Sequence, residues 1–222
     1  MNTYWLNNQN NKNLIVFFAG WSFDETPFKF LDCKDYDVLI VYDYNEIKPL
    51  NIFQQFNQYE NKILITWSMG VFAAYILRDF FKNFDYKIAV NGTVTPVDNE
   101  FGIPIKMFEL TLKHAAVGLS GKFYKNVFKT NEEFEKYMKN PVQRTIENRV
   151  SELENLYELI KSTKINYTNF YDTAFVSEFD KIIPPQNQKA SHNKNNVTVK
   201  NLSTGHFPFY QFNSWDEIIK CK

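Results

Sequence analysis

Short, unbroken runs of apolar residues recur through the first ninety residues of the chain, and each is followed by a small or polar residue. Such runs are typical of strands that are buried on both faces of a sheet. We therefore predict strands at residues 14–18, 38–42, 63–66 and 87–90. Residues 49–59 and 71–81 carry apolar side chains at helical spacing. This alternation predicts an α/β fold, with a mostly parallel central sheet and helices on both faces.

The alternation stops between residues 104 and 162, where the pattern predicts consecutive helices. The clearest is an amphipathic stripe formed by Ile146, Val150, Leu153, Leu156 and Ile160. Strand patterns return at residues 173–176 and 197–202, and a closing helix is predicted near residues 215–219. We expect a single domain over residues 1–222 that carries a helical insertion, or lid, at residues 104–162.

Composition and charge exclude several classes of function. The 222 residues carry a formal net charge of +0, so no overall positive field points to nucleic acid. The two cysteines, Cys33 and Cys221, suit a reducing compartment and form no zinc-binding pattern. The first residues lack the features of a secretion signal, and no apolar run is long enough to cross a membrane. We expect a cytoplasmic protein that contacts neither nucleic acid nor membrane.

The segment Thr66-Trp67-Ser68-Met69-Gly70 joins a predicted strand directly to a predicted helix. A sharp strand-to-helix turn that exposes a serine nucleophile usually has small residues two positions before and after it, as in G-x-S-x-G. Gly70 fits this pattern, whereas Thr66 departs from it. The alternative interpretation is that Ser68 caps the helix, which is a common role for serine.

A histidine that follows the last predicted strand favours the nucleophile. In hydrolases with a serine on such a turn, the partners follow in the order serine, acid, histidine. His206 lies in the loop after residues 197–202 and is our candidate general base. His192 is predicted in a solvated loop, and His114 is predicted to be an ordinary residue of the helical insertion.

The acid is expected after the next-to-last predicted strand. Asp180 is the better candidate, because Asp-x-Ile-x-Pro places a short carboxylate in a rigid turn. Glu178 is the alternative acid, and Asp180 could instead cap a turn. Asp172 precedes the strand and would lie at the wrong end of the sheet.

Catalysis of this kind also needs backbone N–H groups that face the developing oxyanion. We expect Met69, at the start of the helix after Ser68, to supply one of them. The loop Phe18-Ala19-Gly20-Trp21-Ser22 is expected to supply the other through the Trp21 N–H, since Gly20 allows close approach. Trp21 and Trp67 are candidate contacts for an acyl chain, although core packing is an equally good interpretation of Trp67.

The segments FFAGW, TWSMG, NGT-x-TP followed by FGIP, SEFDKIIPP and GHFPF together resemble the α/β-hydrolase superfamily. More closely, the chain resembles the BioG-type esterases of biotin synthesis over nearly its whole length. The resemblance implies a serine esterase that hydrolyses the methyl ester of pimeloyl-acyl carrier protein and releases methanol. It implies Ser68 as nucleophile, Asp180 as acid and His206 as base, with Trp21 and Met69 at the oxyanion. Phe207, next to His206, is a further candidate substrate contact. No metal ion or other cofactor is expected.

A carrier protein is acidic, and the charges of the insertion fit such a partner. Residues 104–149 contain nine Lys or Arg and five Glu, although a solvated helical face would also explain them. We predict carrier contacts at Lys122, Lys125, Arg144 and Arg149. Two other functions stay open at this point. One is a general carboxylesterase or acyl-carrier thioesterase, and the other is a catalytically inactive binding protein with a hydrolase fold.

Overall fold

The computed structural model describes residues 1–166 and 169–221. Within these residues, seven strands form one sheet in the order β1-β3-β2-β4-β5-β6-β7. Only β1 is antiparallel to its neighbour, and every other strand pair is parallel. The strands are β1 (Asn2–Asn7), β2 (Asn13–Phe18), β3 (Tyr36–Tyr42), β4 (Asn61–Trp67), β5 (Tyr86–Val90), β6 (Thr173–Ser177) and β7 (Thr198–Leu202).

The α-helices are α1 (Met69–Ile76), α2 (Ile105–Lys113), α3 (Ala115–Leu119), α4 (Lys122–Val127), α5 (Asn131–Met138), α6 (Ile146–Ser162), α7 (Pro185–Lys194) and α8 (Trp215–Lys220). Short 3-10 helices occur as η1 (Thr26–Phe28), η2 (Asn51–Gln58), η3 (Arg78–Phe81) and η4 (Phe209–Gln211). The predicted α/β class is therefore confirmed. The predicted helix 49–59 is the 3-10 helix η2, and the predicted helix 71–81 is divided into α1 and η3.

One strand and one α-helix were not predicted, and each has a physical reason. The strand β1 lies at the sheet edge, where none of its residues is fully buried and no buried apolar run results. The helix α7 contains mostly polar residues, so its sequence carries no apolar periodicity.

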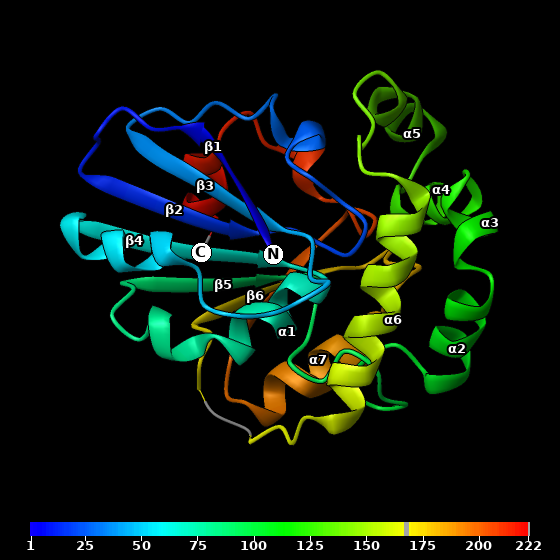
Figure 1. The fold of residues 1–222 in the computed structure, drawn as a ribbon. Coiled ribbons are helices and arrows are strands. Elements are labelled where there is room, and N and C mark those ends of the chain that lie inside the picture. Colours follow the sequence, from blue (N-terminus) through cyan, green and yellow to red (C-terminus); the bar gives the residue numbers. More distant parts are fainter. Residues whose placement is uncertain (167–168, 222) are drawn as a thin grey trace.

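Successive residues of β2 show how the two faces of the sheet are covered. Phe17 packs against Trp215 of α8, with ring centroids 4.9 Å apart, whereas Phe18 packs against Phe81 of η3 at 5.5 Å. Neighbouring side chains of a strand point to opposite faces, so α8 and η3 lie on opposite sides. Figure 1 shows α1 and α7 below β5 and β6, and the red C-terminal helix behind β2 and β3. The apolar run is therefore buried from both sides, as its composition predicts.

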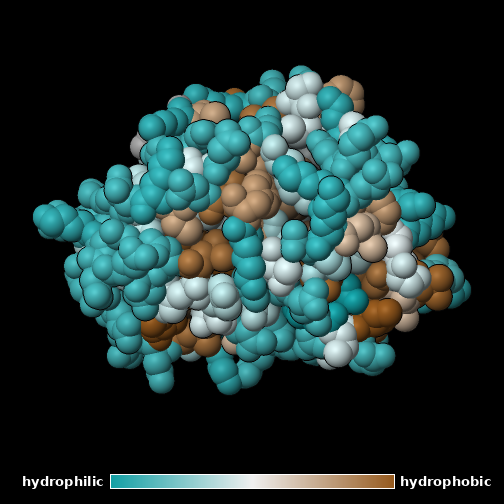
Figure 2. Space-filling view, turned by 90° about the horizontal axis from the view of Figure 1, so that it is seen from above, coloured by the Kyte–Doolittle hydropathy of each residue, from teal (hydrophilic) through white to brown (hydrophobic). Residues whose placement is uncertain are grey.

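The helical insertion joins β5 to β6 and covers one end of the sheet. Figure 1 shows α2 to α5 at the side of the molecule, with α6 between them and the sheet. Seen from above, apolar side chains appear in several small groups on a mostly hydrophilic face, and one of these groups lies at the insertion (Figure 2). Among the described residues, no helix is both long enough and apolar enough to pass through a membrane.

Candidate active site

Ser68 occupies the sharp turn between β4 and α1. Its φ of 56° and ψ of −125° are unusual for a residue with a side chain, and its N–H donates to the carbonyl of Val90 at 3.0 Å. Gly70 makes the turn possible, because a Cβ there would lie 2.4 Å from the carbonyl oxygen of Phe18. Thr66 is fully buried, and its hydroxyl donates to the carbonyl of Ile88 at 3.1 Å. The threonine is therefore compatible with the turn.

Three side chains from distant parts of the sequence form a continuous hydrogen-bond chain. His206 Nε2 lies 2.9 Å from Ser68 Oγ, and His206 Nδ1 lies 2.8 Å from Asp180 Oδ2. All three residues are buried, with exposed fractions of 2–7%. The imidazole thus bridges a hydroxyl and a carboxylate, which is the arrangement that allows a histidine to accept a serine proton.

The acid in contact with His206 is Asp180. Its other oxygen, Oδ1, accepts the N–H groups of Ile182 at 2.8 Å and Ile183 at 3.0 Å, so the carboxylate also closes the predicted turn. Glu178 is exposed. Asp172 accepts the N–H of Lys87 at 2.7 Å, near the amino ends of β5 and β6. The two predicted interpretations of Asp180 are therefore compatible with each other.

The His206 loop is held by a residue whose contact with it was not predicted. Asn91 follows β5 with a φ of 43° and is fully buried. Its Nδ2 donates to the His206 carbonyl at 2.9 Å, and Trp67 Nε1 donates to the same oxygen at 2.8 Å. In the sequence, the only sign of this contact is that the Asn91-Gly92 pair directly follows a predicted strand.

The prediction for His192 was wrong. The residue belongs to α7, is 3% exposed, and bonds through Nε2 to the carbonyl of Gly92 at 2.9 Å. Burial lowers its pKa to about 4, because the charged imidazolium would lose its hydration. Gly92 in turn packs against Ser68, since a Cβ at residue 92 would lie 2.4 Å from the Ser68 carbonyl oxygen. His192 therefore supports the turn at Ser68 through its contact with Gly92.

Trp21 N–H and Met69 N–H are available as oxyanion donors. Within the described part of the chain, neither N–H has a hydrogen-bond partner. A turn closed by the Phe23 N–H and the Gly20 carbonyl at 3.2 Å presents Trp21, with Ser22 at a φ of 70°. A Cβ on Gly20 would approach the Trp67 ring to 2.9 Å, which explains the glycine.

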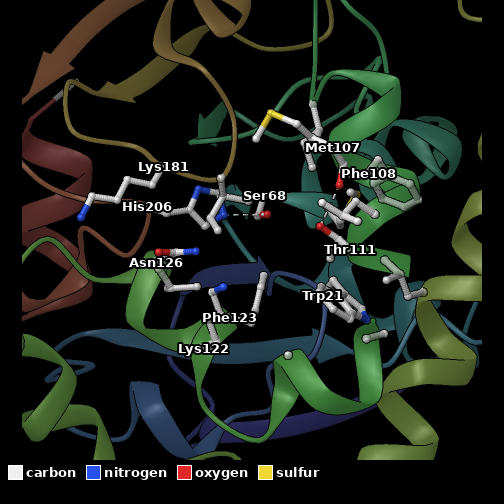
Figure 3. Close-up of a pocket in the computed structure, with 18 of the residues that line it drawn as sticks. Trp21, Ser68, Met107, Phe108, Thr111, Lys122, Phe123, Asn126, Lys181 and His206 are labelled. Carbon is white, nitrogen blue, oxygen red and sulfur yellow. Dashed lines mark hydrogen bonds between the residues drawn. The ribbon is translucent and has the colours of Figure 1, made fainter. Parts of the chain in front are cut away.

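A cavity of about 450 Å³ lies beside Ser68 and His206. Its lining includes Trp21 and Trp67, the two candidate acyl contacts, together with apolar residues of α2 to α4. Figure 3 shows Met107, Phe108, Thr111 and Trp21 on one side of it, and Lys122, Phe123, Asn126 and Lys181 on the other. One wall is therefore apolar except for Thr111, and the opposite wall carries the lysines, with the Ser68 hydroxyl between the two walls.

The prediction that Phe207 contacts the substrate was wrong. Phe207 is 1% exposed and lies outside the cavity lining, within a cluster of aromatic rings. Its ring centroid is 5.4 Å from that of Trp67 and 5.3 Å from that of Phe128. The residue after His206 thus anchors the loop in the core, so its ring has no free face for a ligand.

Comparison with known proteins assigns the chain to a family. Residues 1–218 match the family model described as pimeloyl-ACP methyl esterase BioG. The chain belongs to this family. The crystal structure of BioG from Haemophilus influenzae is similar over 98% of this chain and 99% of its own, with a TM-score of 0.87 and 29% identity. The family is one of ester hydrolases with the α/β-hydrolase fold.

Two further proteins are similar to the chain. A malonyl-[acyl-carrier protein] O-methyltransferase from Bacteroides fragilis is 31% identical over 201 residues, which cover 88% of this chain and 40% of that protein. The chain thus spans less than half of that relative. An esterase from Exiguobacterium antarcticum, EaEST, shares the fold at a TM-score of 0.65 and 14% identity, covering 99% of this chain and 92% of its own.

The predicted carrier contacts of this BioG-family chain fall into two groups. Lys122 and Lys125 of α4 are exposed, and Lys122 lines the cavity. For Arg144 and Arg149 the prediction was wrong, because both guanidinium groups are buried. Arg144 pairs with Glu152 at 2.8 Å, and the Arg149 side chain bonds to Tyr124. The net positive charge of the insertion therefore includes internal ion pairs, which a count of residues does not separate from surface charge.

Lys181 is a cavity residue that the sequence analysis did not single out. It is exposed and lines the cavity one position after Asp180. Because it lies outside the insertion, a charge count restricted to residues 104–149 could not find it. His114, between α2 and α3, also lines the cavity, although it was predicted to be an ordinary residue of the insertion.

Proposed function

We propose that the chain hydrolyses the methyl ester of pimeloyl-acyl carrier protein through an acyl-enzyme on Ser68. The observation that carries the proposal is the hydrogen-bond chain of Ser68, His206 and Asp180 beside the apolar cavity, in a chain of the BioG family. The products are methanol and the free carboxylate of the pimeloyl group, still attached to its carrier.

In the first half of the reaction, His206 Nε2 accepts the Ser68 proton while Oγ attacks the ester carbonyl carbon. Asp180 Oδ2 accepts the Nδ1–H of His206, which fixes the tautomer and stabilises the imidazolium. The carbonyl oxygen becomes an oxyanion that receives the N–H groups of Trp21 and Met69. The tetrahedral intermediate then collapses, and His206 gives its proton to the departing methoxide oxygen.

In the second half, water attacks the acyl-enzyme with His206 again as base. The Ser68 oxygen leaves with the proton from the imidazolium, which restores the free enzyme and releases the acid. The same two N–H groups stabilise the second oxyanion. Each step uses residues of the chain and water alone.

The two walls of the cavity support a long acyl substrate on a charged carrier. The methylene chain would lie against the apolar wall formed by Trp21, Phe108 and Met107. The cations Lys122 and Lys181 border the opposite wall, where an acidic partner would gain from their charge. Lys125 is exposed on the same helix as Lys122 and extends this positive surface. We propose these three lysines as carrier contacts, which keeps the predicted Lys122 and Lys125 and replaces the two arginines with Lys181.

The proposal is tested with pimeloyl-carrier methyl ester as substrate for the wild-type chain and Ser68→Ala. We expect methanol release by the wild type and a loss of several orders of magnitude in Ser68→Ala, with unchanged circular dichroism. Carrier thiol is assayed in the same reactions. Release of thiol without methanol would make the protein a thioesterase. A wild-type chain that releases neither and resists fluorophosphonate labelling at Ser68 would be an inactive binding protein.

A further inference from the structure

Glu152 is a buried carboxylate that takes no part in the proposed proton transfers. It lies on α6 of the insertion, and its exposed fraction is 0%. Oε2 accepts the Ser22 N–H at 3.1 Å, and Oε1 accepts the Tyr44 N–H at 2.8 Å. Arg144 lies 2.8 Å from Oε2. One side chain of the insertion thus binds backbone groups from two loops of the sheet.

Both of these contacts act on the loop that presents the Trp21 N–H. Ser22 directly follows Trp21, and its positive φ of 70° is held in place by the bond to Glu152. Tyr44, the second backbone partner, donates its hydroxyl to the carbonyl of Ala19 at 2.6 Å. The carboxylate therefore fixes residue 22 directly and residue 19 through one intermediate. The turn at Gly20 and Trp21 lies between these two points.

The same loop has further bonds to the insertion. The indole N–H of Trp21 donates to the Arg149 carbonyl of α6 at 2.7 Å, and Ser22 Oγ lies 3.0 Å from the Tyr124 hydroxyl of α4. An oxyanion hole needs its N–H groups fixed before the charge develops. The helices of the insertion supply this restraint through their hydrogen bonds to the loop. Among the side chains that make these bonds, Glu152 is the carboxylate.

Electrostatics indicate that stability alone does not explain a buried glutamate at position 152. A buried ion pair is commonly no more stabilising than a well-packed apolar pair, because both ions lose their hydration. Burial raises the pKa of Glu152, whereas Arg144 and the two backbone N–H groups favour the ionised form. Arg144 also pairs with Asp43 at 3.1 Å, so its charge has a second partner. An apolar residue at position 152 could not accept the two backbone hydrogen bonds that Glu152 accepts.

We propose that Glu152 is a positioning residue that fixes the turn carrying the Trp21 N–H, so that this donor faces the oxyanion formed at Ser68. The proposal rests on the proposed function for the identity of the oxyanion. The placement of the Trp21 and Ser22 amides by Glu152 is independent of it and is measured separately. The insertion thereby acts on the transition state as well as covering the cavity.

The test compares the wild type with Glu152→Gln, which keeps the side-chain shape and removes the charge. Activity is measured on p-nitrophenyl acetate, per site titrated with a fluorophosphonate. We expect kcat to fall about 30-fold with KM changed by less than about twofold. The affinity for an alkyl boronic acid, which forms a tetrahedral adduct with the serine, should fall by a similar factor. Amide NMR of the same samples should show shifted Trp21 and Ser22 N–H signals, whichever ester the enzyme prefers.

Asp43→Asn is the matched control, because it also removes an ionised partner of Arg144, while the Ser22 and Tyr44 N–H groups both donate to Glu152 and not to the Asp43 side chain. We expect this variant to lower Tm while leaving kcat per site within about twofold of the wild type. If Glu152→Gln does not fold, Glu152→Asp keeps the charge beside Arg144 and shortens the reach to Ser22, and it should show the same selective loss. Unchanged kcat per site, or unchanged boronate affinity with lowered kcat, would overturn the proposal. So would unshifted Trp21 and Ser22 signals.

Discussion

Asp180 Oδ2 lies 2.8 Å from His206 Nδ1, and the Gln188 side-chain amide donates to the same oxygen at 2.8 Å. With the two backbone donors on Oδ1, the carboxylate has four hydrogen-bond partners. All of them are donors if His206 carries its proton on Nδ1. This tautomer leaves Nε2 free to accept the Ser68 proton, so the surroundings of Asp180 favour the arrangement needed for attack.

We expect Asp180→Asn to lower kcat by about 10³- to 10⁴-fold, because the amide can present an N–H to Nδ1 and favour the wrong tautomer. Glu178→Gln is the matched control, since it makes the same change of charge on an exposed side chain two positions away. It should keep nearly full activity. Methyl-ester hydrolysis by both variants, with Tm measured alongside, checks the assignment. Equal losses in the two variants would contradict it.

Gly70→Ala is expected to destabilise the fold. The new Cβ would lie 2.4 Å from the Phe18 carbonyl oxygen and 2.5 Å from that of Ala19. Both atoms belong to the backbone, so relief requires a shift of α1 against β2, at a cost of about 1–3 kcal/mol. Urea unfolding measures this loss. Gly118→Ala, where the nearest atom is 3.9 Å from the new Cβ, should change stability far less.

The buried His192 makes stability depend on pH. Its pKa of about 4 in the folded chain is below its ordinary value of 6.5, so the unfolded chain binds the proton first as the pH falls. The contribution is complete above pH 6.5 and is lost progressively between pH 6.5 and 4. It amounts to roughly 3 kcal/mol if the full shift is realised.

His192→Gln tests this contribution, because glutamine retains an N–H for the Gly92 carbonyl but does not titrate. The difference in unfolding free energy between wild type and variant should change steadily from pH 6.5 to 4 and level off above that range. A difference independent of pH would show that His192 does not titrate as expected.

Charge-reversal variants should affect activity when they replace the surface lysines and stability when they replace a buried arginine. Lys122→Glu with Lys181→Glu is expected to lower kcat/KM for the carrier-bound ester about tenfold at low salt, and less at high salt. Hydrolysis of p-nitrophenyl acetate, which has no carrier, should change much less. The double reversal of Lys82 and Lys200, which do not line the cavity, is the control.

For Arg144→Glu we expect a loss of stability instead, because the new carboxylate would be placed next to those of Asp43 and Glu152. Thermal unfolding checks this expectation. A stable Arg144→Glu variant with weakened use of the carrier substrate would restore Arg144 as a carrier contact.

The strands of the core were predictable from sequence because their apolar runs reflect burial on both faces. Ser68, Asp180 and His206 were predictable because each follows a strand, so the topology brings them to one edge of the sheet. Glu152 was beyond such reasoning, since its place beside the apolar stripe of α6 predicts only a polar residue next to the core. Its partner is the backbone N–H of Ser22, and a sequence pattern does not show which backbone groups bind a side chain.

Surface charge was the least predictable property. Lys122 and Arg144 have equivalent charges in the sequence, yet one is exposed and the other pairs internally with carboxylates from distant residues. His192 gave the same difficulty, because its polar neighbours in α7 predicted solvent exposure. Burial of a polar side chain depends on a partner that only the fold supplies.

The bonds from α6 to the Gly20–Phe23 turn also limit how the enzyme can be engineered. Exchanging residues 104–162 for the corresponding segment of another hydrolase, in order to change the acyl preference, would remove the acceptors of the Trp21 indole and the Ser22 amide. A chimera would recover turnover only if the donor segment carried equivalent acceptors, or if the turn were transplanted with it. The covering helices and the turn should therefore be redesigned as one unit.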